Sequence, residues 1–198
     1  MIPSMTNAAA HRALETLGRE WTGRGVAVEC GCWLGASSVA LLRGLVAAGY
    51  DRPFYGFDRW AANDSEVAKA ADQGMTLAVG QDISTEWVMN ALLVYPKLRA
   101  RRGNLGAMRW DGGPVEVLVL DAAKREPIFS HVMGEFVPSL VDGASVVLLD
   151  YGYWRRFEGA QADALRCQER WVVAHEGFEY LAPVGEVGAW FRYREGGK

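Results

Sequence analysis

Cysteine is scarce in this sequence, and its three occurrences lack the spacing of a disulfide or metal framework. Cys30 and Cys32 form a C-x-C pair, and Cys167 stands alone far along the chain. A secreted disulfide scaffold needs an even set of cysteines, and a zinc site needs a second pair or nearby histidines. The cysteines are therefore predicted to be small buried residues in a reducing compartment, and a cytoplasmic location is expected.

A basic charge excess and a long apolar run are also missing. The 198 residues carry a formal net charge of −3, whereas proteins that bind nucleic acid usually present a basic face. No apolar run approaches the roughly 20 residues of a membrane-spanning helix. Residues 1–21 lack the charged start and continuous apolar block of a signal peptide. Neither a nucleic acid nor a membrane is expected as a partner.

The chain does contain short strand-like runs that alternate with amphipathic segments. Five strands are predicted, the third polar like an edge strand, at residues 25–31, 53–60, 98–104, 115–123 and 144–152. Two further runs flank Gly185-Glu186 and predict an antiparallel hairpin at residues 178–184 and 188–194. Strands that alternate with helices form a parallel sheet covered on both faces, so an α/β fold is expected.

Helices are predicted where apolar residues recur at helical spacing. The predicted helices cover residues 6–21, 37–48, 85–95, 127–140 and 158–176. Ser84 is the expected N-cap of the third helix, and Pro127 opens the fourth. The glycine-punctuated residues 61–84 predict a short helix followed by a mobile loop. The length suits one domain over residues 1–198, with a helical extension at 1–24 and a core at 25–198.

Acidic residues close four of the predicted strands. These residues are Glu29, Asp58, Asp121 and Asp150. A carboxylate inside a sheet is costly unless it is paired or solvated, and open α/β sheets bind ligands beyond the carboxyl ends of their strands. The pattern therefore predicts a ligand site along this edge of the sheet.

The turn after the first strand distinguishes two classes of nucleotide-like ligand. A dinucleotide site needs G-x-G-x-x-G, whereas Gly31 and Gly35 have the spacing G-x-x-x-G, preceded by Glu29. A carboxylate there would repel a pyrophosphate, but it suits a ligand with a cationic amine or sulfonium. Asp58 can accept hydrogen bonds from the two hydroxyls of a ribose in either class. The C-terminal hairpin argues against an all-parallel dinucleotide fold.

These features, in this order along nearly the whole chain, resemble the class I S-adenosylmethionine-dependent methyltransferases. The most specific segments are ECGCWLGASS at residues 29–38 and VEVLVLDAAK at residues 115–124. The resemblance implies a three-layer Rossmann-like fold with a mostly parallel seven-stranded sheet and an antiparallel C-terminal hairpin. It also implies S-adenosylmethionine as cofactor.

The resemblance assigns cofactor-binding roles along the strand ends. Glu29 and the turn from Gly31 to Gly35 would lie along the methionine portion, Asp58 would hold the ribose, and Trp60 or its neighbours would cover the adenine. Asn104 would reach the adenine edge, where many members of the family have an aspartate. The remaining members of the expected cofactor-binding set are Ser37, Arg59 and Asp121.

The expected catalytic residues are Asp121, Lys124 and Asp150, which resemble the catechol-type and macrolide-sugar O-methyltransferases. Those enzymes hold a divalent metal with acids at the two aspartate positions, and the catechol-type enzymes use a lysine as base. An asparagine follows their second acid, where this chain has Tyr151, and the sugar enzymes carry further acids, absent here. Whether Mg²⁺ binds to Asp121 and Asp150 therefore stays open. Without the metal, Lys124 would be a surface or ion-paired lysine.

The aromatic segment that follows Asp150 is expected to face the acceptor. Tyr151, Tyr153 and Trp154 could stack on a planar or sugar-like molecule. The sequence thus predicts methylation of a small-molecule acceptor, at oxygen. A cyclase or decarboxylase on the same fold and a non-catalytic binding module remain as alternatives. The chain leaves little room for an acceptor domain, so a small acceptor or a lid from a partner subunit is expected, and a homodimer stays open.

Overall fold

The strands form one seven-stranded sheet of order β3-β2-β1-β4-β5-β7-β6 in the computed structural model, which describes residues 2–197. The bounds are β1 (Val26–Cys30), β2 (Phe54–Asp58), β3 (Leu98–Arg102), β4 (Val115–Leu120), β5 (Leu140–Leu148), β6 (Phe178–Val184) and β7 (Gly188–Tyr193). Strands β1 to β5 pair in parallel, and β7 pairs antiparallel with both β5 and β6. The predicted mostly parallel sheet with a C-terminal hairpin is confirmed.

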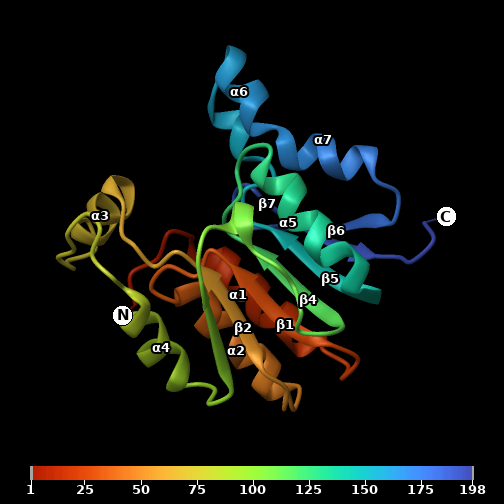
Figure 1. Cartoon of the computed structure of the whole chain (residues 1–198), viewed down its shortest axis with the longest axis horizontal. Helices are drawn as coiled ribbons and strands as arrows, with labels where there is room; N and C mark the ends of the chain where they lie inside the picture. Colours follow the sequence, from red (N-terminus) through yellow and green to blue (C-terminus); the bar gives the residue numbers. More distant parts are fainter. Residues whose placement is uncertain (1, 198) are drawn as a thin grey trace.

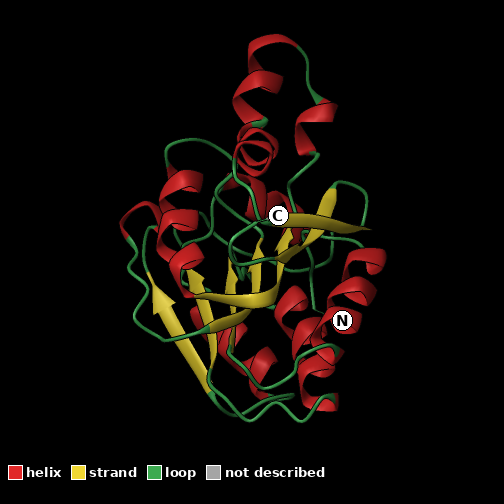
Figure 2. Cartoon of the chain, turned by 90° about the vertical axis from the view of Figure 1, so that its right-hand side faces the viewer, coloured by secondary structure: helices red, strands yellow, loops and turns green. Residues whose placement is uncertain are grey.

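Helices cover both faces of this sheet (Figures 1 and 2). The helices are α1 (Ala8–Arg19), α2 (Ala36–Ala47), α3 (Asp64–Ala71), α4 (Ser84–Leu92), α5 (Ile128–Phe136), α6 (Gly159–Leu165) and α7 (Cys167–Ala174). The core layer under α1, α2 and α4 is separate from the layer under α5 and α7. Strands β1, β4 and β5 contribute apolar residues to both layers, which explains their nearly continuous apolar sequences.

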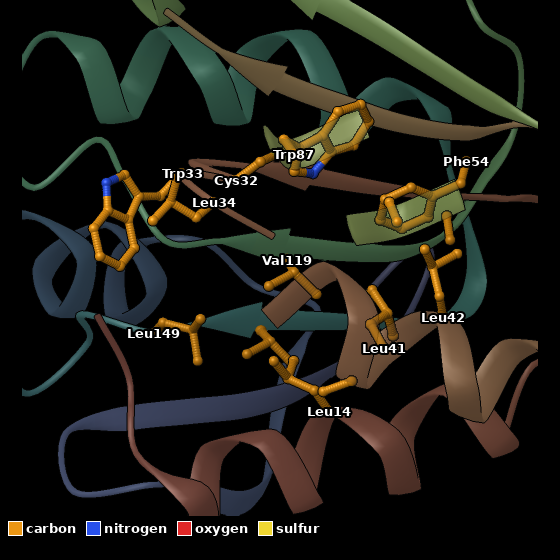
Figure 3. Packing of buried hydrophobic residues seen from close by; sticks show 14 of the residues in the cluster. Leu14, Cys32, Trp33, Leu34, Leu41, Leu42, Phe54, Trp87, Val119 and Leu149 are labelled. Carbon is orange, nitrogen blue, oxygen red and sulfur yellow. The ribbon is translucent and has the colours of Figure 1, made fainter. Parts of the chain in front are cut away.

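Helix α1 packs closely on α2 because two glycines let the helix backbones approach each other. A Cβ on Gly18 would lie 2.5 Å from the Leu41 carbonyl oxygen, and one on Gly44 would lie 2.1 Å from that of Glu15. Leu14 of α1 and Leu41 of α2 lie in the same core layer as Val119 of β4 (Figure 3). The N-terminal helix is thus part of the packed body of the protein.

Two details of the predicted helices are wrong. The helix expected over residues 158–176 is two helices, α6 and α7, because the backbone of Arg166, with a ψ of 7°, departs from helical geometry between them. Ser84 is the first residue of α4 and not its N-cap. The side chain of Asp82 instead accepts a hydrogen bond from the Ser84 backbone N–H at 2.9 Å. Within residues 2–197, no helix has the length and apolar character needed to cross a membrane.

Candidate functional site

Two adjoining cavities lie along the edge formed by the carboxyl ends of the parallel strands. The first, of about 540 Å³, is bordered by Gly31 after β1, Asp58 at the end of β2 and Asn104 after β3. The second, of about 400 Å³, is bordered by Asp150 and by the turn between β6 and β7. Three residues border both cavities: Met5, Asp121 and Lys124. The predicted strand-end site is therefore a pair of connected hollows.

Asp58 is fixed in the first cavity by two backbone amides. Its Oδ2 accepts a hydrogen bond from the Trp33 N–H at 2.9 Å, and its Oδ1 accepts one from the Trp60 N–H at 2.7 Å. Each carboxylate oxygen can accept more than one hydrogen bond, so both remain able to bind a pair of hydroxyl groups. Asp58 therefore combines a fixed orientation with unused acceptor capacity that faces a cavity.

Gly31 brings the ends of β1 and β4 together. Its φ is +89°, and a Cβ at this position would lie 2.5 Å from the backbone oxygen of Asp121. Only glycine fits such a left-handed conformation with so close a neighbour. Gly35 also has a positive φ and precedes α2, but it borders neither cavity, and Ser37 borders only a small recess next to Trp33.

Glu29 lies elsewhere than its motif suggests. The carboxyl group is fully buried and borders neither cavity. Its Oε2 accepts a hydrogen bond from the Ser38 hydroxyl, which itself accepts one from the Trp87 indole N–H at 2.8 Å. Burial raises the pKa of Glu29 to about 7. The expectation that Glu29 faces a cationic ligand does not fit this position, because the side chain turns into the layer under α2 and α4.

The residues expected around an adenine separate into two groups. Asn104 and Arg59 border the first cavity, where Asn104 accepts a hydrogen bond from the Gly106 N–H at 2.9 Å and Arg59 pairs with Glu66. Trp60, in contrast, is fully buried, with its ring 5.0 Å from that of Trp87. The expectation that Trp60 itself covers a ligand is wrong, because its side chain is core.

Asp121, Lys124 and Asp150 come together at the junction of the two cavities. The Lys124 ammonium lies 2.9 Å from Asp150 Oδ1 and 4.7 Å from the centre of the Tyr153 ring. Burial raises the pKa of Asp121 and of Asp150. Burial is the largest influence on the pKa of Lys124 and lowers it, but Asp150, Asp121 and Tyr153 together raise it, and the net direction is upward. A lysine held as an ammonium is not suited to act as the general base that the catechol-type resemblance implied.

The expected Mg²⁺ site does not fit the donors that this junction offers. Asp150 Oδ1 contacts the Lys124 ammonium, and Oδ2 is enclosed by protein without a hydrogen-bond partner. The described residues contain no cluster of three acidic, histidine or cysteine side chains arranged to hold a metal. Of the two aspartates in the expected metal site, only Asp121 keeps a carboxylate open to the cavity. The residue after Asp150 adds no ligand, because the Tyr151 ring packs on Phe191.

Of the aromatic segment after β5, only Tyr153 borders the second cavity. Tyr151 lies 5.1 Å from Phe191 in the layer under α5 and α7. Trp154 lies under the Arg166 guanidinium, 4.2 Å from its ring centre. Tyr151 and Trp154 border neither cavity, and their contact with an acceptor stays a prediction.

Sequence reasoning missed the N-terminal segment entirely. Met5 borders both cavities, and Thr6 and Asn7 border the second. Two hydrogen bonds join the Ser4 backbone to the Gln73 side chain, at 2.8 and 3.0 Å. Nothing in the sequence before α1 signals such a role, because the contact with Gln73 is long-range.

Comparison with known proteins shows which fold this is. Neither the protein-family models nor the curated proteins include a match to the sequence. Among solved structures, the O-methyltransferase NovP superposes with a TM-score of 0.69 at 15% identity, over 98% of this chain and 83% of that one. An O-methyltransferase from Bacillus cereus in complex with SAH gives 0.62 at 14%, over 98% and 84%. CalS11, a TDP-rhamnose 3'-O-methyltransferase, gives 0.57 at 15%, over 92% and 76%.

The chain therefore has the Rossmann-like fold of the class I methyltransferases. The strand order and the antiparallel β7 agree with the fold expected from the sequence. At identities of 15% or less, this likeness establishes the fold alone. The chemistry has to be argued from the residues around the two cavities.

Proposed function

We propose that the protein is an S-adenosylmethionine-dependent methyltransferase that methylates a small-molecule acceptor at oxygen. The observation that carries the proposal is the geometry of Asp58, whose carboxylate is fixed by two backbone amides at the edge of a cavity of about 540 Å³. The structural neighbours support it, since several are O-methyltransferases and the one from Bacillus cereus was solved in complex with SAH.

The first cavity suits the cofactor. Asp58 would hold the ribose hydroxyls, and Asn104 would meet the adenine edge from the loop after β3. Gly31 lets the chain turn away without a side chain at the junction of β1 and β4. The order of these residues would place the methionine end of the cofactor near Asp121. When bound, the cofactor supplies a methyl group on a positively charged sulfur. An acceptor oxygen can attack this methyl group in line and displace the sulfur.

The second cavity suits the acceptor. It meets the first at Asp121 and Lys124, so an acceptor there would lie next to the reactive methyl group. Its volume of about 400 Å³ is that of a small-molecule pocket. Charged side chains from three elements border it: Lys69 from α3, Arg156 after β5 and Glu186 in the β6–β7 turn. The protein's own contribution would be to orient a polar acceptor and to exclude water.

Binding of S-adenosylhomocysteine, measured by isothermal titration calorimetry, tests the cofactor assignment. We expect binding by the wild-type protein and its loss in Asp58→Ala. Asp111→Ala is the matched control, because Asp111 is an exposed aspartate that pairs with Arg101 and borders neither cavity. NADH should not stabilise the protein. Absence of S-adenosylhomocysteine binding at millimolar concentration would refute the proposed function.

Release of S-adenosylhomocysteine from S-adenosylmethionine separates methyl transfer from the alternatives. A panel of phenols and sugar derivatives should include an acceptor that accelerates this release. A cyclase, a decarboxylase or a non-catalytic module would bind the cofactor without releasing it in demethylated form. Nothing in the structure favours these alternatives over methyl transfer.

We infer that the protein acts in a reducing compartment, the cytoplasm. Cys30, Cys32 and Cys167 are buried free thiols, which supports this inference. The homodimer and the lack of a nucleic-acid partner stay predictions. Size-exclusion chromatography with light scattering would give the oligomeric state.

A further inference from the structure

Lys124 lies where the two cavities meet. It follows β4 by a short loop and borders both hollows, and 42% of its side chain is exposed. Its ammonium contacts Asp150, whose side chain is only 8% exposed. The face of the Tyr153 ring stabilises the same charge from 4.7 Å. A buried carboxylate, an aromatic face and a cavity thus surround one lysine nitrogen.

A divalent cation at this place would need the carboxylate oxygens that Lys124 already uses. Mg²⁺ is bound through one or two carboxylates at short distance, with water in the remaining positions. One oxygen of Asp150 contacts the ammonium, and the other is enclosed by protein. A metal could therefore bind the first oxygen of Asp150 only in competition with the Lys124 ammonium.

We propose that the Lys124 ammonium is the resident cation of the acceptor site, in the place that the family resemblance gives to a divalent metal. This inference rests on the proposed function for the identity of the acceptor site. One hydrogen of the ammonium goes to Asp150, and the others are free to meet an acceptor oxygen. A metal chelates two adjacent acceptor oxygens, whereas a hydrogen bond from an ammonium needs only one. The acceptor class is therefore a molecule with one suitably placed oxygen, without the need for a vicinal pair.

Mn²⁺ binding, measured by electron paramagnetic resonance, tests the proposal without an acceptor. The protein is stripped with EDTA, desalted, and titrated with Mn²⁺ with and without S-adenosylhomocysteine. We expect the wild-type protein to show no binding at millimolar Mn²⁺. In Lys124→Ala, Mn²⁺ binding should become measurable, at least about tenfold tighter than the wild-type detection limit, because Asp121 and Asp150 lose their counter-charge.

Lys69→Ala is the matched control. Lys69 borders the same cavity, and its ammonium makes no ion pair with another residue in the part of the chain that the structure describes. Its removal takes the same charge from the same cavity but leaves Asp150 paired, so Mn²⁺ binding should not appear. Lys124→Gln repeats the test with a longer side chain if the alanine variant is unstable, and thermal denaturation reports the folding of each variant.

Two results would overturn the proposal. One is Mn²⁺ binding by the wild-type protein that disappears in Asp150→Asn, because the metal would then share the site with Lys124. The other is an unchanged affinity in folded Lys124→Ala and Lys124→Gln. A wild-type protein that fails to bind S-adenosylhomocysteine refutes the proposed function instead, and the Mn²⁺ comparison among variants still reports on Lys124.

Discussion

The buried carboxyl group of Glu29 predicts a stability that falls as the pH rises. Its ordinary pKa of 4.5 becomes about 7 in the folded protein, with burial as the largest cause. Between these two values the folded chain holds a proton on Glu29 that the unfolded chain has released. The unfolded state binds fewer protons in this range, so the free energy of unfolding decreases with increasing pH.

The size of this effect follows from the two pKa values. The gap between 4.5 and about 7, at about 1.4 kcal/mol for each pH unit, amounts to about 3 kcal/mol. The destabilisation by Glu29 is absent below pH 4.5, grows as the pH rises, and is complete above pH 7. Glu29→Gln removes the titration while keeping a side chain of the same shape. The stability of this variant relative to wild type should therefore increase by about 3 kcal/mol between pH 4 and pH 9.

Urea unfolding at a series of pH values measures this difference. The buried Asp150, whose pKa shift is caused by burial and by Lys124, contributes the same slope to both proteins and cancels in the comparison. Ser38→Ala is a second comparison, because the Ser38 hydroxyl donates to the Glu29 carboxylate and lowers its pKa. That variant should depend on pH more steeply than wild type. A stability difference between Glu29→Gln and wild type that stays constant with pH would refute the reasoning.

Three further substitutions probe the geometry of the site edge. Gly31→Ala should lower the free energy of unfolding by about 3 kcal/mol in thermal or urea denaturation, because its Cβ would lie 2.5 Å from the Asp121 carbonyl oxygen in a left-handed backbone. A loss below about 1 kcal/mol would contradict the close approach. Gln73→Ala removes both hydrogen bonds to the Ser4 backbone and should speed the dissociation of S-adenosylhomocysteine in stopped-flow measurements. An unchanged rate would show that the N-terminal segment does not close the cavity. Glu116→Ala removes a buried acceptor of four hydrogen bonds near the amino ends of the strands. It should lower the free energy of urea unfolding by about 3 kcal/mol or more, while calorimetry shows an unchanged S-adenosylhomocysteine affinity in the folded fraction.

The sheet could be predicted from the sequence because each strand is marked by its own residues and not by distant ones. Strands buried on both faces are nearly continuously apolar, and an acidic residue lies within two positions of the carboxyl end of β1, β4 and β5. The positions of Asp58 and Asp121 at the cavities follow directly from that edge. The β6–β7 hairpin was equally visible, because Gly185-Glu186 separates two strand-like runs.

The directions of several side chains could not be predicted, because distant residues decide them. Glu29 and Asp58 both lie near the ends of parallel strands. The Glu29 carboxyl group, however, lies in the layer under α2 and α4, where it accepts a hydrogen bond from Ser38, which in turn accepts one from Trp87. An aromatic residue after a strand can cover a ligand or fill the core. Trp60, in the loop after β2, is core because its ring packs against the indole of Trp87 on α4. Lys124 follows the same logic, since its pairing with Asp150 joins the ends of two strands.

The N-terminal segment bears on how the acceptor site is covered. A chain of this length was expected to need either a small acceptor or a lid from a partner subunit. Ser4 is held by Gln73 after α3, and the Asn7 side chain donates to Glu186 in the β6–β7 turn at 3.4 Å. The segment between them crosses the edge of both cavities and places Met5 at their junction. The chain thus supplies part of its own cover on this side of the site.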